Sequence, residues 1–292
     1  MQNIKEQLIE KTRILKENRI TLPKLEARLL LAKVLKKNLN WIFLNFDYKI
    51  SKKNIILFGS LVKKKINKIP TSYLLGKKEF WGKNYKVNRH TLIPRPETEL
   101  IISAIKKKYH FNSSLSVLDL GTGTGCILLS ILSEFPKAFG IGTDIKSNII
   151  KVAKFNSKRH CLLKRSFFSV QNWNLHISFK QLLVLNKKLY KKNKFDLVVS
   201  NPPYILRSKM KNLMEEVKFE PHVALDGGYN GLKAYKNIFS QIKSVLSKNG
   251  SILFEIDPPR AKNIKKILEK EGFKKIIFLK DFSNRRRVVL AK

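Results

Sequence analysis

A stiff polar turn, Ser200-Asn201-Pro202-Pro203-Tyr204, follows the apolar stretch 195–199 and holds side chains that could do chemistry. The composition of 195–199 predicts a buried strand. The two prolines fix their own φ angles and restrict Asn201, which precedes them. The turn offers an amide, backbone carbonyls and an aromatic ring at a strand's carboxyl end, where open α/β sheets bind ligands. Taken alone, Asn-Pro-Pro fits an ordinary proline-stopped loop equally well.

A second candidate site is the glycine-rich stretch 121–125, Gly-Thr-Gly-Thr-Gly. It lies between a predicted strand at 116–120 and a predicted helix at 126–134, which is how a nucleotide-binding α/β unit begins. The dinucleotide fingerprint needs a glycine where Cys126 stands, and the phosphate-binding loop of NTPases needs a lysine that is missing here. The glycines would instead let the backbone approach an adenosine-containing ligand.

Two more predicted strands end in polar side chains. Asp144 follows the strand 138–143, about twenty positions after the glycine turn, where an acid can bind both ribose hydroxyls. Gln171-Asn172-Trp173 follows a strand at about 166–170, and its amide and indole could bond and stack an adenine. A surface turn with a half-buried tryptophan is the alternative for this last group.

The run from Leu92 to Leu100, Leu-Ile-Pro-Arg-Pro-Glu-Thr-Glu-Leu, opens an apolar helix. Pro96 and the acids at 97 and 99 suit a helix N-terminus, where carboxylates complement the dipole. Arg95, fixed between two prolines, could clamp a carboxylate through a bidentate fork. The alternative is a helix N-terminus of unusual composition that has only a structural role.

The flanking sequence predicts the elements that must position these residues. Residues 1–69 carry helical periodicity, with a third helix at about 53–67, and predict a small bundle suited to recognising a partner. The alternation in 79–87 predicts a β-hairpin. Residues 175–194 contain six lysines and no acid, which predicts a solvated insertion.

Composition limits the class of protein. The 292 residues, 43% of them hydrophobic, predict a globular chain; no apolar run reaches eighteen residues, and the N-terminus lacks a secretory signal. Two cysteines without a pairing pattern and five scattered histidines predict a reduced cytoplasmic setting and no metal. The net charge of +39 is spread along the chain, which favours diffuse surface charge with weak attraction to nucleic acid or ribosomes over a dedicated nucleic-acid face.

Together these motifs resemble the S-adenosylmethionine-dependent methyltransferases of the seven-stranded Rossmann-like class. More narrowly, the chain resembles the release factor glutamine N5-methyltransferase family (the PrmC/HemK group). The resemblance extends through 219–221 and 226–232 and implies an α/β fold, a class I methyltransferase domain preceded by a helical bundle and a β-hairpin linker. We expect a helical substrate-recognition domain at 1–75, the hairpin linker at 76–93 and the methyltransferase domain at 94–292.

The resemblance also implies roles for the motif residues. Cofactor binding is expected from Gly121, Thr122, Gly123, Thr124, Gly125, Asp144, Trp173 and Asn201. Substrate binding is expected from Asn201, Pro202, Pro203, Tyr204, Arg95 and Glu97, with Asn201, Pro202 and Tyr204 catalytic. The chain departs from the family pattern at two places: Asn172 replaces the family's usual aspartate, which implies rearranged adenine hydrogen bonds, and Asp257-Pro258-Pro259 replaces a glycine after Glu255-Ile256.

The implied reaction is methylation of the side-chain nitrogen (N5) of the glutamine in the Gly-Gly-Gln loop of peptide chain release factors. S-adenosylmethionine would be consumed and S-adenosylhomocysteine released. An amide nitrogen is a poor nucleophile, and the turn holds no His or Cys to act as base. We therefore expect the Asn201 oxygen and the Pro202 carbonyl to accept the amide N–H bonds, with Tyr204 packing on the amide plane.

Two other functions fit parts of the same sequence. Asn-Pro-Pro-Tyr is shared with DNA amino-methyltransferases, so adenine N6 or cytosine N4 of DNA or rRNA is an alternative acceptor. Such an enzyme should carry a target-recognition region and a pocket for a flipped base, and the sequence shows neither. A non-enzymatic RNA-binding protein on a decayed methyltransferase fold is the second alternative, although the glycine turn and the proline turn are both intact.

Overall fold

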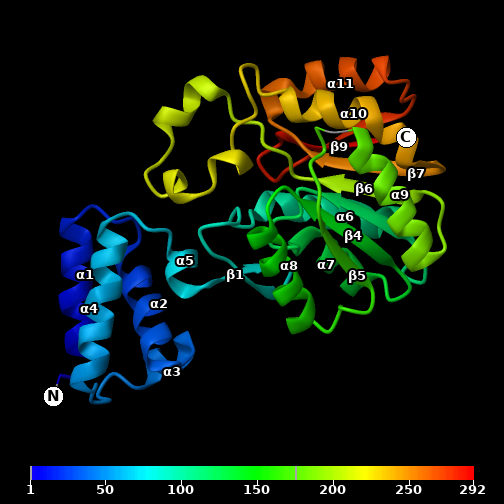
Figure 1. Cartoon of the computed structure of the whole chain (residues 1–292). Coiled ribbons are helices and arrows are strands. Elements are labelled where there is room, and N and C mark those ends of the chain that lie inside the picture. The colour runs from blue at the N-terminus through cyan, green and yellow to red at the C-terminus, as the bar shows by residue number, and fades with distance from the viewer. Residues whose placement is uncertain (1, 175) are drawn as a thin grey trace. The chain divides into compact units, whose positions relative to one another are not determined.

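The structure, a computed structural model, describes residues 2–174 and 176–292 (Figure 1). Its helices are α1 (Ile4–Glu17), α2 (Pro23–Leu35), α3 (Leu39–Leu44), α4 (Lys52–Ile66), α5 (Thr71–Leu75), α6 (Glu99–Lys108), α7 (Cys126–Glu134), α8 (Ser147–Arg159), α9 (His176–Tyr190), α10 (Lys233–Val245) and α11 (Ala261–Lys270). Its strands are β1 (Lys77–Phe80), β2 (Lys83–Lys86), β3 (Ser116–Leu120), β4 (Phe139–Asp144), β5 (Ser166–Val170), β6 (Phe195–Ser200), β7 (Leu246–Glu255), β8 (Ile276–Lys280) and β9 (Arg286–Ala291). Short 3-10 turns are η1 (Pro96–Thr98), η2 (Arg207–Asn212), η3 (Val217–Phe219), η4 (His222–Ala224) and η5 (Pro258–Arg260).

Contacts within the described residues divide the chain into two compact units. The helical unit comprises Met1–Lys78 together with Met214–Phe219, and the α/β unit comprises Glu79–Leu213 and Glu220–Lys292.

The helical unit follows from its capping residues and its apolar spacing. Asn3 and Glu6 form a reciprocal capping box at the start of α1, and Ser51 caps α4 by accepting from a backbone N–H. The interior packs aliphatic side chains of α1 and α2 around the buried ring of Phe58 on α4. Helices are therefore confirmed over most of 1–69, and α4 confirms the helix predicted at about 53–67.

A buried lysine secures the segment Met214–Phe219 to this unit. Lys65 is 2% exposed, and its ammonium lies 2.8 Å from Glu216 and 3.5 Å from Glu26. A buried ammonium is stable only when it is paired, so the two carboxylates compensate the loss of water around it.

Seven strands of the described residues form one sheet in the order β5-β4-β3-β6-β7-β9-β8. Neighbours from β5 to β7 pair in parallel, whereas β9 runs antiparallel to both β7 and β8. The chain order thus reverses direction between β3 and β6, and in open α/β sheets ligands bind at such a switch point.

The sheet is buried on both faces, as its apolar strands predict. Alternation along β3 sends Val117 into one cluster, with α6 and α7, and Leu118 into the other, with α10 and α11. The predicted strands 116–120 and 166–170 and the predicted helix 126–134 are confirmed residue for residue.

The prediction of a solvated insertion at 175–194 is wrong for the part that the structure describes; residue 175 lies outside it. This segment forms helix α9, whose Phe179 and Leu182 are buried in the second cluster. Asn186, also buried, accepts a 2.8 Å hydrogen bond from the Ser116 hydroxyl at the start of β3. Most of the lysines point to solvent, so their number concealed the apolar spacing of the helix.

The predicted hairpin is confirmed as the pair β1 and β2, which form a separate two-stranded sheet. Among the helices of the described residues, none is long and apolar enough to cross a membrane. The same residues contain no group of three or more His, Cys, Asp or Glu side chains placed to hold a metal ion.

Candidate active site

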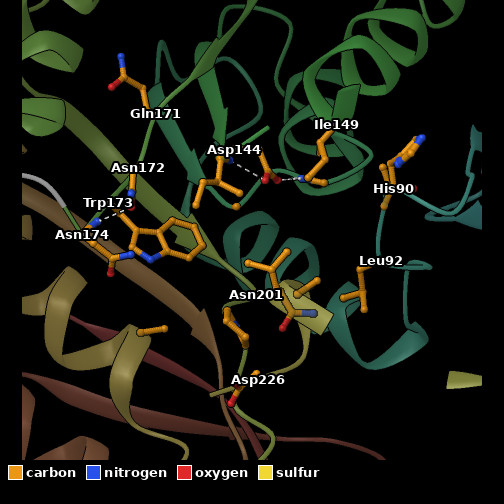
Figure 2. A pocket seen from close by; sticks show the side chains of 18 of the residues that line it. His90, Leu92, Asp144, Ile149, Gln171, Asn172, Trp173, Asn174, Asn201 and Asp226 are labelled. Atoms are coloured by element: carbon orange, nitrogen blue, oxygen red, sulfur yellow. Dashed lines mark hydrogen bonds between the residues drawn. The ribbon is translucent and has the colours of Figure 1, made fainter. Parts of the chain in front are cut away.

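A pocket of the α/β unit lies at the carboxyl ends of β3, β4, β5 and β6 (Figure 2). These strands are neighbours in the parallel part of the sheet, so the side chains that follow them converge. The sequence-predicted residues on the pocket wall are Gly121, Gly123, Asp144, Trp173, Asn201 and Pro203. Leu92, Gln171, Asn172 and Asp226, which belong to motifs noted in the sequence, also lie on the wall. The wall further contains residues that the sequence did not single out, namely His90, Thr91, Ile145, Ile149, Asn174, Val223, Ala224, Lys233 and Ala234.

The glycine turn is tied to the neighbouring strand through Asp144. One carboxylate oxygen of Asp144 accepts the backbone N–H of Gly123 at 2.9 Å, and the other accepts that of Ile145 at 2.8 Å. Burial raises the pKa of Asp144, and the two N–H bonds counteract that rise. Each oxygen can accept a further hydrogen bond, so the carboxylate can hold the turn and still bind a ligand's hydroxyls.

The remaining residues of the glycine turn hold its backbone in place. The Thr122 hydroxyl donates to the fully buried carboxylate of Asp119 at 2.6 Å, and burial raises the pKa of Asp119 to about 7. The backbone carbonyl of Thr124 accepts from the Asn156 amide at 2.8 Å. Gly125 has φ of +80° at the start of α7, a conformation that favours glycine. Thr122, Thr124 and Gly125 therefore support the described pocket wall without forming it.

Trp173 brings an aromatic surface to the glycine turn. A Cβ atom at Gly121 would lie only 2.8 Å from two indole carbons of Trp173, so glycine is needed for this approach. Asn172, on the same wall, accepts the backbone N–H of Asn174 at 3.0 Å. A glycine backbone, an indole face and a carboxylate at adjacent strand ends fit an adenosine-containing ligand.

Asn201 is held by side chains from distant parts of the sequence. Its side-chain nitrogen donates to the Thr98 hydroxyl at 3.1 Å, and that hydroxyl donates to the Glu255 carboxylate at 2.5 Å. Glu255, at the end of β7, also accepts from the Tyr204 hydroxyl at 3.1 Å. Burial raises the pKa of both Glu255 and Tyr204. No local pattern in the sequence indicates that these four residues form one network.

The backbone after Tyr204 is clasped by a glycine-rich segment, 225–231. A Cβ atom at Gly227 would lie 2.6 Å from the Tyr204 backbone, and one at Gly231 would lie 2.7 Å from the Tyr204 carbonyl oxygen. Ile205 exchanges backbone hydrogen bonds with this segment, accepting from Gly227 at 2.8 Å and donating to Leu225 at 2.9 Å. The glycine spacing in 226–232 was visible in the sequence, but only the fold reveals the chain that it accommodates.

Arg95 and Glu97 lie outside the described pocket wall, as do Pro202 and Tyr204. The Arg95 guanidinium does meet a carboxylate, but this is Glu220 of the same chain, at 2.5 Å. The second oxygen of Glu220 accepts the backbone N–H of Ile93 at 2.9 Å. This pairing fixes the 92–99 run to the loop before α10, and the residues of that run and its flank that reach the pocket are His90, Thr91 and Leu92.

The sequence matches two described families. Residues 6–76 match the PrmC N-terminal domain, and residues 111–279 match a methyltransferase domain. The release factor glutamine methyltransferase of Clostridium acetobutylicum is 36% identical over 99% of this chain and 98% of its own length. The chain belongs to the release factor glutamine methyltransferase family.

A second kind of relative of this methyltransferase is longer. The bifunctional methyltransferase of Rickettsia typhi is 34% identical over 92% of this chain, and the match covers 53% of that protein. The chain therefore spans about half the length of the bifunctional relatives it matches.

Solved structures share the fold at lower identity. Human methyltransferase 10 domain containing protein has a TM-score of 0.51 and 16% identity, covering 72% of this chain and 89% of that chain. The N-terminal domain of human METTL16, solved in complex with SAH, has a TM-score of 0.50 and 16% identity over 73% of this chain and 76% of that one. These likenesses establish the α/β methyltransferase fold.

Proposed function

We propose that this enzyme methylates the side-chain nitrogen (N5) of the glutamine in the Gly-Gly-Gln loop of peptide chain release factors, with S-adenosylmethionine as donor. The observation that carries the proposal is the orientation of Asn201. Its nitrogen is engaged by Thr98, which leaves its carbonyl oxygen to accept an N–H bond from a substrate amide. The names of the relatives that match almost the whole chain supply the substrate.

The cofactor half of the pocket would hold the donor's adenosine. Asp144 would accept from the ribose hydroxyls, and the backbone at Gly121 and Gly123 would pack closely against the ligand because no Cβ intervenes. Trp173 would offer its ring to the adenine, and Asn172 a side-chain amide. When bound, the donor supplies an electrophilic methyl group on a sulfonium.

The acceptor half would hold the glutamine amide. The Asn201 oxygen and the Pro202 carbonyl would each accept one N–H bond of the amide and direct its nitrogen toward the donor's side of the pocket. Both acceptors carry partial negative charge, so they would stabilise the positive charge that develops on the nitrogen as it is methylated. The surplus proton would leave to solvent after transfer, since deprotonating an amide beforehand needs a base far stronger than any side chain near neutrality.

The release factor itself would be recognised beyond the pocket. A Gly-Gly-Gln loop can enter a narrow site as extended backbone because two of its residues lack side chains. The helical unit, whose sequence matches the PrmC N-terminal domain, would bind the rest of the factor. The positive charge of the chain would add a weak, salt-sensitive attraction to ribosomes or nucleic acid.

Transfer of a labelled methyl group tests this function. Purified enzyme is incubated with labelled S-adenosylmethionine and, in parallel, with a release factor, with DNA and with rRNA. We expect label in the release factor and none in either nucleic acid, and a release factor whose loop glutamine is replaced by glutamate should stay unlabelled. Label in DNA or rRNA alone would transfer the assignment to a nucleic-acid amino group.

A further inference from the structure

Glu255 is a buried carboxylate whose two oxygens are both engaged within the acceptor half of the site. It lies at the last position of β7 and is 1% exposed. One oxygen accepts from Thr98, which belongs to the 92–99 run, and the other accepts from Tyr204, which ends the proline turn. One side chain thus connects two sequence motifs that are more than a hundred residues apart.

The direction of each hydrogen bond in this network follows from its neighbour. The Thr98 hydroxyl donates to the Glu255 carboxylate, and a hydroxyl has only one proton to donate. The Thr98 oxygen can then only accept from Asn201, and the Asn201 group that faces it must be the NH₂ group. The Asn201 carbonyl oxygen is left as the end of the side chain that can accept from a ligand.

We propose that Glu255 is a positioning residue: acting through Thr98, it fixes which end of the Asn201 amide meets the substrate, and through Tyr204 it fixes the turn that carries Asn201. The inference rests on the proposed function, because it explains why Asn201 presents an acceptor to an amide N–H. A reversed Asn201 would present its NH₂ group to the substrate NH₂, and two donors cannot bond.

The network requires a carboxylate at this position. A glutamine at 255 keeps the shape, but its NH₂ group would face either Thr98 or Tyr204, and both now donate toward the carboxylate. If the NH₂ group faced Thr98, that hydroxyl would be free to donate to Asn201 and the amide could reverse. If it faced Tyr204, the turn would lose its anchor.

The test removes only the hydroxyl that relays the orientation. Thr98→Val keeps the shape of the side chain, and Thr98 makes no side-chain capping bond to α6 that would be lost. We expect kcat for release-factor methylation to fall roughly 10- to 100-fold, because the reacting groups lose their alignment. The KM for the release factor and the calorimetric affinity for S-adenosylmethionine should stay near the wild-type values, and Thr98→Ser should restore kcat.

Tyr235→Phe is the matched control. The Tyr235 hydroxyl is buried and donates at 2.9 Å to the main-chain carbonyl of Glu255, so this variant removes a bond to the same residue without touching its carboxylate. We expect a lower unfolding temperature and an unchanged kcat. A loss of kcat equal to that of Thr98→Val would reduce Glu255 to a structural role and overturn the inference.

A second readout does not depend on activity. In protein labelled with ¹⁵N at asparagine side chains, hydrogen exchange of the Asn201 NH₂ group should be slow in the wild type and in Thr98→Ser and faster in Thr98→Val and Glu255→Gln. Equal exchange in all four proteins would overturn the positioning role even if the enzyme methylates release factors. Absence of methylation by the wild type, with the exchange pattern as expected, would instead overturn the proposed function and leave the orientation of Asn201 established.

Discussion

The two halves of the pocket are held in place by different means. At the ends of β3 and β4 the glycine turn is organised by nearby groups: Asp144 binds the Gly123 N–H, and Asp119 binds the Thr122 hydroxyl three residues along the chain. At the end of β6 the proline turn is organised by two side chains that are far away in the sequence, Thr98 and Glu255, and by the backbone of the clasp 225–231.

This difference has a functional meaning. A cofactor site must offer a fixed surface to one unchanging ligand. Backbone groups and glycines can form such a surface because few flexible side chains have to be ordered. An acceptor site must hold one amide oxygen in one orientation, which only a directional network of side chains can specify. Substitutions in the two halves should therefore have separable consequences, in binding at one end and in turnover at the other.

The largest separation is expected for Asn201→Ala. This substitution removes an acceptor that matters most when charge develops on the substrate nitrogen, so kcat should fall roughly 100- to 1000-fold. Affinity for S-adenosylmethionine, measured by calorimetry, should change little. The exposed Asn249→Ala, in the amino-terminal part of β7, serves as control and should behave as wild type. Normal turnover by Asn201→Ala would refute the acceptor role.

Asp119→Asn tests the support of the glycine turn by the buried Asp119 carboxylate, because it should change how stability depends on pH. The pKa of Asp119 is raised by burial to about 7, so between its unfolded value and about 7 the native state retains a proton that the unfolded state releases. The unfolded state binds fewer protons there, and the free energy of unfolding falls as pH rises.

The Asp119→Asn variant lacks this titration, so its free energy of unfolding should rise relative to that of the wild type as pH increases. Above pH 7 the difference should be on the order of a few kcal/mol, since one pKa unit corresponds to about 1.4 kcal/mol. Denaturant unfolding at several pH values, without added cofactor, measures the gap. Stability curves that stay parallel from pH 4 to pH 8 would show that Asp119 is ionised throughout.

Asp144→Ala should weaken the binding of S-adenosylmethionine, whereas Asn201→Ala should lower kcat. Hydrogen bonds to a charged group contribute about 1.5–3 kcal/mol, so the dissociation constant for S-adenosylmethionine should rise roughly 10- to 100-fold. At saturating cofactor the turnover should recover most of its wild-type value. Unchanged affinity in calorimetry would remove the ribose assignment.

The smallest effect concerns the clasp around Tyr204. Gly231 and Gly76 share a φ of +72°, but a Cβ atom would meet the Tyr204 carbonyl oxygen at 2.7 Å in the first case and open space in the second. Both alanine variants should lose about 1 kcal/mol to backbone strain. For Gly231→Ala the loss in free energy of unfolding should be larger, and kcat should also fall several-fold. Gly76→Ala should keep its kcat. Equal losses in both would mean that the clasp does not constrain the turn.

The same contrast explains how much could be predicted from the sequence. The strands, the glycine turn, the converging strand ends and the positions of Asp144, Trp173 and Asn201 all follow from local patterns, and the structure brings those three residues to one pocket. Helix α9 was missed because the six lysines of 175–194 concealed the spacing of its buried side chains, such as Phe179 and Leu182. Thr98 and Glu255 were missed because their meaning lies in contacts across the fold: a threonine before a helix and a glutamate ending an apolar strand have no local signature.

Arg95 shows what a sequence pattern cannot decide. Its chemistry was anticipated correctly, since the guanidinium does pair with a carboxylate, but the sequence cannot distinguish a substrate's carboxylate from Glu220. A role for Arg95 and Glu97 in substrate binding stays a prediction.

The most direct test of the central claim is to locate the methyl group on the product. A release factor incubated with enzyme and S-adenosylmethionine is digested, and the loop peptide is sequenced by fragmentation mass spectrometry. We expect one added methyl group, on the side-chain nitrogen of the Gly-Gly-Gln glutamine, and none when Asn201→Ala replaces the wild-type enzyme over the same time. A methyl group on any other residue, or equal modification by both enzymes, would contradict it.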